Sequence, residues 1–182
     1  STNTSGETRT WEEQRESLSK NGWGLYNLML RDPKTKPDPF TITSMMGLCF
    51  SSTELTNLVG QAIHEFHLNC SSAVLRAAIT RFGELGDPSS ACRLFSHYVS
   101  APVSTRNWNV LLGALAKGAE ANNSLPLDNH KAQVESILGS GTAAKSVGKD
   151  FFRTVDGLVC SEAARHLLNL VDEPTSQTYC VA

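Results

Sequence analysis

The sequence predicts an all-α fold, and three observations lead to this prediction. From Trp11 onward, apolar residues recur with the spacing of one helix face. Strand-like alternation of apolar and polar residues beside Asn-Gly or Asp-Gly turns is missing. Clusters of glycine, proline, asparagine and serine divide the chain into segments of helix length. We therefore expect a series of short antiparallel helices joined by turns.

The composition is that of an ordinary globular domain. The chain has 182 residues, of which 40% are hydrophobic and 19% charged, enough to bury one core. Its formal net charge is -2, so a nucleic-acid role would require a basic face formed locally. Five scattered cysteines without a C-x-x-C pair fit a reducing compartment. No apolar run approaches the roughly 18 residues that span a bilayer, so we expect no membrane insertion.

The turn signals fix the order of the expected elements. Residues 1–10 are polar and are predicted to form a disordered lead-in. The NGWG stretch at Asn21–Gly24 is expected to break the first helical segment in two. Pro37 and Pro39 are expected to end the following helix and to prepare the start of the next. Further breaks are expected at Leu68–Ser72, Gly86–Pro88, Ser100–Thr105, Asn122–Asp128 and Gly139–Ala143.

Three of the expected helices repeat one another at an interval of 33 residues, which separates Thr43 from Arg76 and Arg76 from Asn109. Their apolar positions coincide as well, as the stripe of one helical face requires. The coinciding residues are Met46, Ile79 and Leu112, and then Cys49, Phe82 and Leu115. A second helix is expected after the first two of them, at Leu55–Leu68 and Pro88–Val99.

A period of this length with two helices per unit is typical of a helical-hairpin solenoid, in which neighbouring units bury a shared core. We expect a right-handed α-solenoid of about four stacked hairpins over residues 11–121. A diverged repeat or C-terminal capping helices would follow over 122–175, and a tail over 176–182. The alternative is a non-repeating α-helical domain whose three matched segments agree by chance.

Four stretches resemble the pentatricopeptide repeat family, in the long and short repeat variants of its plant-type members. The family's junction between repeats is similar to LMLRDPKTKPDPFTITSMMGLC at Leu28–Cys49. Its long variant carries a G-x-x-I-H signature like that in VGQAIHEF at Val59–Phe66. Its short variant resembles LRAAITRFGELGDPSSACRLFSHY at Leu75–Tyr98, and the opening of its next repeat resembles RNWNVLLGALAKGAE at Arg106–Glu120.

The resemblance implies that the chain binds single-stranded RNA, with one base read by each repeat. The base-reading positions would be Thr43, Arg76 and Asn109, with Ser71 and Ser104 as their partners at the ends of repeats. Arg81 and Arg106 belong to a set of basic residues that would face the phosphates. Arg76 and the two serines depart from the residues that the family commonly uses for base reading.

From this resemblance we expect a non-catalytic, RNA-binding subunit of an organellar ribonucleoprotein, such as the mitochondrial ribosome. It would contact RNA and neighbouring proteins in the mitochondrial matrix after removal of a transit peptide, with the chloroplast as a second choice. The alternative is a protein-protein scaffold, or an accessory subunit of a respiratory or other organellar complex, without RNA contact. A fragment of a longer RNA-processing factor is a third reading.

Candidate enzyme and metal sites are weak in this sequence. His64, His67 and Cys70 are spaced three apart, but a fourth ligand is not evident, so we expect no metal. GSGTAAKS at Gly139–Ser146 lacks the spacing of a phosphate-binding loop. We see no catalytic constellation, and we expect no enzyme activity, no cofactor and no small-molecule substrate.

Overall fold

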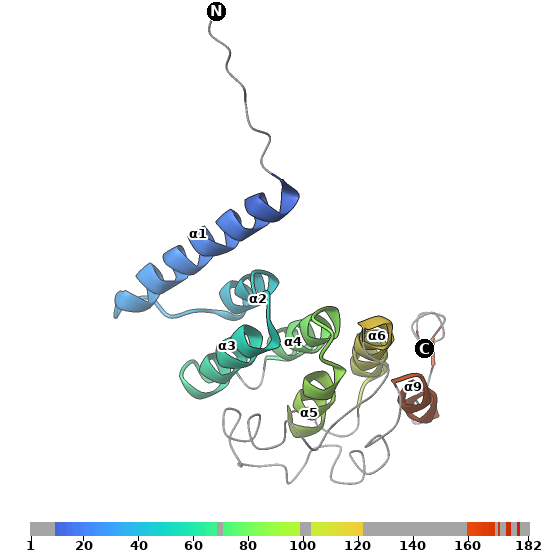
Figure 1. The fold of residues 1–182 in the computed structure, drawn as a ribbon. Coiled ribbons are helices and arrows are strands. Elements are labelled where there is room, and N and C mark those ends of the chain that lie inside the picture. Colours follow the sequence, from blue (N-terminus) through green and yellow to red (C-terminus); the bar gives the residue numbers. More distant parts are fainter. Residues whose placement is uncertain are drawn as a thin grey trace, which may run out of the picture.

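A computed structural model describes residues 10–68, 71–98, 103–121, 160–169, 171, 174–175 and 178. These residues form helices and no strand, so the all-α prediction is confirmed for this part of the chain. The helices are α1 (Trp11–Arg31), α2 (Pro39–Gly47), α3 (Ser52–His64), α4 (Ser72–Glu84), α5 (Pro88–Tyr98), α6 (Thr105–Ala121) and α9 (Cys160–Leu168), shown in Figure 1. The predicted lead-in before Thr10, the segment 122–159 and most of the tail lie outside the described residues.

Side-chain caps explain where the helices begin. The carboxylate of Asp38 accepts a hydrogen bond of 2.7 Å from the backbone N–H of Thr41, and Pro39 stands in the first turn of α2. At the start of α5, Asp87 accepts a hydrogen bond of 3.0 Å from the backbone N–H of Ser90. Both starts lie at the proline turns that the sequence predicts.

The turn between α4 and α5 depends on a glycine. Gly86 has a φ of 73°, in the left-handed region that glycine adopts without strain. The N–H of Asp87 donates to the carbonyl of Phe82 at 2.8 Å, and the N–H of Gly86 donates to the carbonyl of Gly83 at 3.0 Å. This pair of bonds satisfies two carbonyls at the end of α4 and folds the chain back into α5.

The first helix differs from the one that the sequence predicts. α1 runs without a break, so the expected break at Asn21–Gly24 is wrong. A Cβ atom on Gly22 would collide with the side chain of Leu48, so the glycine lets α1 lie close to the end of α2. Trp23 packs edge-on against the buried Tyr26, with ring centroids 5.7 Å apart. These contacts outweigh the cost of about 1 kcal/mol for each glycine inside a helix.

α2, α4 and α6 lie in a row, with α2 packed against α4 and α4 packed against α6 (Figure 1). α3 packs against α2 and α4, α5 packs against α4 and α6, and α9 packs against α6. α4 and α6 approach closely, because a Cβ atom on Gly83 would lie only 2.5 Å from the Cα of Ala114. The packing of α2 on α4 and of α4 on α6 places three helices 33 residues apart in sequence beside one another.

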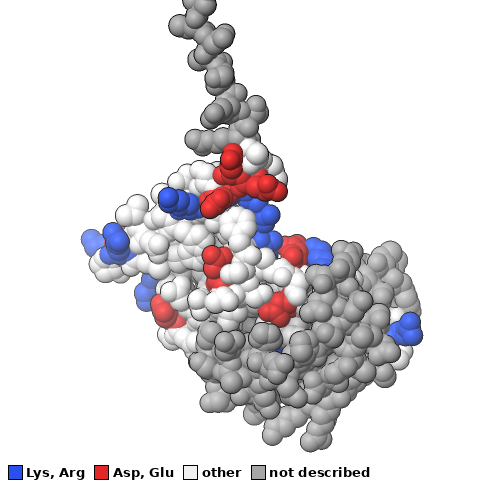
Figure 2. Space-filling view, in the orientation of Figure 1, with Lys and Arg blue, Asp and Glu red and all other residues white. Residues whose placement is uncertain are grey.

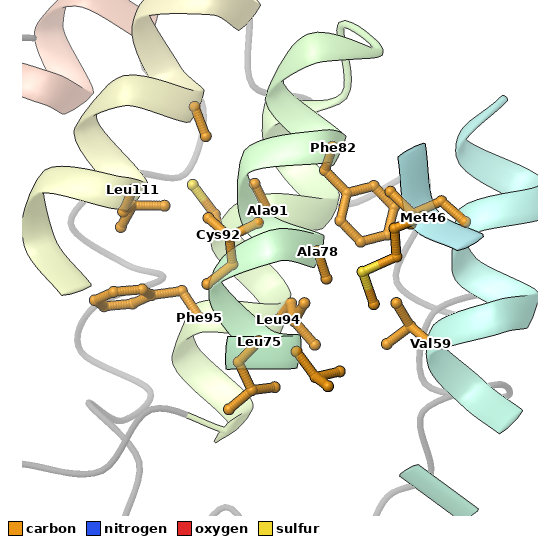
Figure 3. Packing of buried hydrophobic residues seen from close by; sticks show 14 of the residues in the cluster. Met46, Val59, Leu75, Ala78, Phe82, Ala91, Cys92, Leu94, Phe95 and Leu111 are labelled. Carbon is orange, nitrogen blue, oxygen red and sulfur yellow. The ribbon is translucent and has the colours of Figure 1, made fainter. Parts of the chain in front are cut away.

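The apolar stripe that repeats along the sequence forms the centre of the core. Its six residues are between 0% and 3% exposed: Met46, Ile79, Leu112, Cys49, Phe82 and Leu115. Figure 3 shows Met46 of α2 and Phe82 of α4 in one cluster with Val59 of α3 and Leu94 of α5. The predicted buried face is therefore confirmed.

α1 is the longest helix in the described part of the chain, with 21 residues, which is the length that a bilayer requires. It carries six charged side chains, five of them in its first ten residues and one at its end: Glu12, Glu13, Arg15, Glu16, Lys20 and Arg31. Neither α1 nor any other described helix combines the length and the apolar character needed to cross a membrane.

Candidate functional site

A cavity of about 900 Å³ lies along the row of α2, α4 and α6. Thr43 of α2, Arg76 of α4 and Asn109 of α6 all line it, so the fold brings the three predicted base-reading positions together. Two predicted phosphate-facing residues, Arg81 and Arg106, line it as well. The remaining lining residues are Met46, Gly47, Ala77, Thr80, Glu84, Thr105, Val110, Gly113, Ala114, Lys117 and Thr175.

The sequence repeat explains this convergence. Thr43 precedes the buried Met46 by three residues, and the same offset separates Arg76 from Ile79. Residues three apart lie one turn apart on the same side of a helix. Each of these positions therefore stands at the edge of the buried stripe of its own helix, and packing the helices side by side aligns the edges into one surface.

The cavity is more basic than the chain as a whole. Among the described residues, four cationic side chains and one carboxylate line it, whereas the whole chain has a formal net charge of -2. The cations are Arg76, Arg81, Arg106 and Lys117, and the carboxylate is Glu84. The local basic face that a nucleic-acid role requires is thus present.

Glu84 forms ion pairs with two of these four cations. Lys117 Nζ lies 2.8 Å from Oε1 of Glu84, and Arg81 Nη1 lies 3.0 Å from its Oε2. The hydrogen bond from Lys117, followed by that from Arg81, keeps the pKa of the Glu84 carboxyl below its ordinary value. Arg81 also donates from Nη2 to the carbonyl of Cys49 at 2.6 Å and so ties α4 to the end of α2.

The other two cations are available for a ligand. Arg76 is half-buried and Arg106 is exposed, and neither forms an ion pair with a residue that the structure describes. Guanidinium groups bind phosphate oxygens in a bidentate geometry. Arg76 and Arg106 come from neighbouring helices, so together they offer two anchoring points along the cavity.

Asn109 brings an unsatisfied acceptor to the same surface. Its side chain is 9% exposed, and its Oδ1 accepts no hydrogen bond from the described part of the chain. Buried polar atoms are nearly always hydrogen-bonded, because an unpaired one costs free energy. A donor on a ligand in the cavity would satisfy this atom. Thr43, by contrast, donates its own hydroxyl to the carbonyl of Phe40 at 3.0 Å.

Ser71 and Ser104 act as helix caps in this structure. Ser71 Oγ accepts a hydrogen bond of 3.4 Å from the N–H of Val74 at the start of α4. Ser104 Oγ accepts one of 3.4 Å from the N–H of Asn107 at the start of α6. Neither serine is among the residues that line the cavity. Their predicted role as partners in base reading stays a prediction.

The sequence analysis missed the ion pair between Glu84 and Lys117. The two residues stand 33 positions apart, which is the interval of the repeat. Residues one repeat apart occupy equivalent places on neighbouring helices, so opposite charges at that interval are placed to pair. The repeat itself therefore contained the signal for this contact.

The expected absence of a metal site remains a prediction. His64 is exposed at the end of α3, and His67 follows it with a φ of 56°. Cys70 lies outside the described residues. Within the described ranges no group of three histidine, cysteine or acidic side chains is placed to hold a metal ion.

No protein-family model, curated protein or solved structure matches this chain. The likeness to pentatricopeptide repeats therefore rests on the sequence motifs alone. The case for a function rests on the residues of the cavity.

Proposed function

We propose that this chain is a short pentatricopeptide-like α-solenoid that binds single-stranded RNA along α2, α4 and α6. One observation carries the proposal: Thr43, Arg76 and Asn109, equally spaced in sequence, line one basic cavity. In repeat proteins of this kind each helical repeat reads one base with two or three side chains.

The residues divide into two chemical roles. Asn109 has an amide that can pair with a base edge, and its Oδ1 is unsatisfied among the described residues. Arg76 and Arg106 would bind phosphates of the same strand. Arg81 is already tied to Glu84 and to the carbonyl of Cys49, so it would contribute positive potential rather than a contact of its own.

We further propose that the protein is a non-catalytic subunit of a mitochondrial ribonucleoprotein, such as the mitochondrial ribosome. About three repeat positions grip few nucleotides, and stacking contributes only about 1–3 kcal/mol for each base. Such a site suits a subunit held in place by neighbouring proteins better than an independent specificity factor.

A scaffold without RNA is the second candidate function. It is favoured by the ion pairs of Glu84, which neutralise part of the positive charge in the cavity. It is also favoured by four large apolar side chains of α1 that are each at least 60% exposed, at Trp11, Leu18, Leu25 and Leu28.

Fluorescence anisotropy with labelled single-stranded RNA separates the two candidates. We expect Arg76→Glu to weaken binding by about tenfold or more and to lower the slope of log affinity against log salt by about 0.7. Lys20→Glu is the matched control, because it makes the same charge change on α1, away from the cavity. Equal losses in both variants, or no binding by the parent chain, would contradict the RNA proposal.

A pull-down from mitochondrial lysate, with and without ribonuclease, tests the proposed assembly. We expect ribosomal proteins and ribosomal RNA in the bound fraction, with part of the signal lost after ribonuclease treatment. Recovery of respiratory-complex subunits without RNA would favour the scaffold.

A further inference from the structure

The chain returns to the proposed RNA site after α9. Thr175 is exposed and lines the cavity, and among the described residues it is the only lining residue that follows α6 in the sequence. Val171 and Thr178, on either side of it in the sequence, are buried, and Val171 belongs to the core. These two buried residues hold Thr175 at the edge of the cavity.

α9 adds no polar group to the row of α2, α4 and α6. Figure 1 shows α9 beside α6, against which it packs, on the side away from α4. Leu167, the eighth residue of α9, is buried like Leu112, the eighth residue of α6. The fifth place, which Asn109 occupies in α6, is taken in α9 by Ala164, which is buried and does not line the cavity. Beyond Asn109, the polar group at the cavity therefore comes from Thr175.

The hydroxyl of Thr175 has its own hydrogen free to donate. The hydroxyl oxygens of Thr175 and Thr178 are 3.2 Å apart, and the N–H of Thr175 donates to Thr178 Oγ at 2.9 Å. Thr178 is 0% exposed, and in the described part of the chain its hydroxyl has one acceptor within reach, Thr175 Oγ. Because buried hydroxyls are hydrogen-bonded, Thr178 donates to Thr175. The hydrogen of Thr175 then remains for a partner in the cavity.

The carboxylate among the described lining residues does not compete for this hydrogen. Both oxygens of Glu84 already accept hydrogen bonds, one from Lys117 and one from Arg81. Figure 2 shows acidic side chains gathered where α1 begins, and no residue of α1 lines the cavity. A ligand in the cavity would supply the acceptor for Thr175.

We propose that Thr175 is a further RNA-contacting residue, whose hydroxyl donates to a phosphate oxygen of the strand next to the nucleotide at Asn109. This inference rests on the proposed function. A phosphate oxygen only accepts hydrogen bonds, so it suits a hydroxyl that is left with a hydrogen to donate. Arg76 and Arg106 in the same cavity favour the same partner. Such a contact positions the strand without reading its sequence.

Fluorescence anisotropy of the full chain with labelled single-stranded RNA tests this contact. Thr175→Val should weaken binding about tenfold, as the loss of one hydrogen bond to a charged group does. The slope of log affinity against log salt should stay unchanged, because the hydroxyl carries no charge. Thr175→Ser keeps the hydroxyl and should restore the affinity of the parent chain. Unchanged affinity in Thr175→Val would overturn the inference.

Two further variants separate the contact from a change in the fold. Thr53→Val is the matched control, because Thr53 is exposed on α3 and does not line the cavity. Thr175→Val also takes an acceptor from the buried hydroxyl of Thr178. Thr175→Val combined with Thr178→Val removes both hydroxyls and keeps both side-chain shapes, so it should fold and bind as weakly as Thr175→Val alone. Parental affinity in this double variant would overturn the inference.

The base sequence of the RNA distinguishes a phosphate contact from a base contact. Oligomers of uridine, cytidine and adenosine should lose affinity by the same factor in Thr175→Val. A loss with only one of the three would indicate base reading and overturn the phosphate contact. Arg76→Glu, measured alongside, separates the two proposals. If it weakens binding and Thr175→Val does not, this inference alone fails, whereas no binding by the parent chain would refute the proposed function as well.

Discussion

The close packing of α4 on α6 makes a definite prediction about the stability of the Gly83→Ala variant. Helix propensity alone would make this change stabilising by up to about 1 kcal/mol, because Gly83 lies in the last turn of α4. The structure predicts the opposite sign. The new Cβ would lie 2.5 Å from the Cα of Ala114 and 2.8 Å from both its Cβ and its carbonyl oxygen. Two of these three atoms belong to the backbone, so no rotamer change relieves the clash.

The magnitude follows from two opposing contributions. Overpacking of a tight contact costs about 1–3 kcal/mol, and the gain in helix propensity offsets about 1 kcal/mol of it. The expected net loss of up to about 2 kcal/mol corresponds to a fall in Tm of up to roughly 8 °C for a chain of this size. Thermal unfolding followed by circular dichroism measures it directly.

Gly113→Ala is the matched control for this experiment. Gly113 also lies inside a helix, α6, but nothing lies within 4 Å of where its Cβ would stand. This variant should raise the Tm, because only the propensity acts. If Gly83→Ala raised the Tm as much as Gly113→Ala, the close approach of α4 and α6 would be refuted.

Three further changes test other contacts. Arg81→Met should destabilise the fold by about 1.5–3 kcal/mol in urea unfolding, since the bond of 2.6 Å to the Cys49 carbonyl is lost; an unchanged midpoint would contradict that role. Burial, followed by the charge of Glu65, raises the pKa of Tyr26 from 10.0 to about 12 in the folded chain, so stability should fall between these pH values. Tyr26→Phe should lessen that fall, and equal falls in both chains would argue against the buried hydroxyl. Burial first, then the charge of Glu54, raises the pKa of the Cys49 thiol to about 12, so native protein at about pH 8 should not be labelled there by a thiol reagent until denaturant is added. Peptide mass spectrometry would detect early labelling that contradicts this.

The core could be predicted because apolar residues recur in the sequence at the spacing of the buried face of a helix. Met46, Ile79 and Leu112 recur at a fixed interval, and each is 1% exposed or less. Thr43, Arg76 and Asn109 are separated by the same interval in the sequence, and in the structure all three line one cavity. The periodicity of the sequence was therefore enough to predict the buried stripe and to align the three central positions of the candidate site.

The failures arise where distant contacts override local signals. The break expected around Gly22 did not occur, because the missing Cβ of this glycine leaves room for the side chain of Leu48, which follows α2. Ser71, expected as a partner at the end of a repeat, caps α4 with its hydroxyl, and its role in base reading stays a prediction. The role of Arg81 as a tie to the Cys49 carbonyl also has no local signature. Such contacts join residues remote in sequence, and a residue's own neighbours do not encode them.

Photo-crosslinking of single-stranded RNA that contains 4-thiouridine tests the central claim most directly. The bound peptides would be identified by mass spectrometry after digestion. The proposed function predicts crosslinks on the cavity-facing parts of α2, α4 and α6, around Thr43, Arg76 and Asn109, and their loss in Arg76→Glu. Crosslinks confined to α1 or α3, or none above the background of a non-binding protein, would contradict the account.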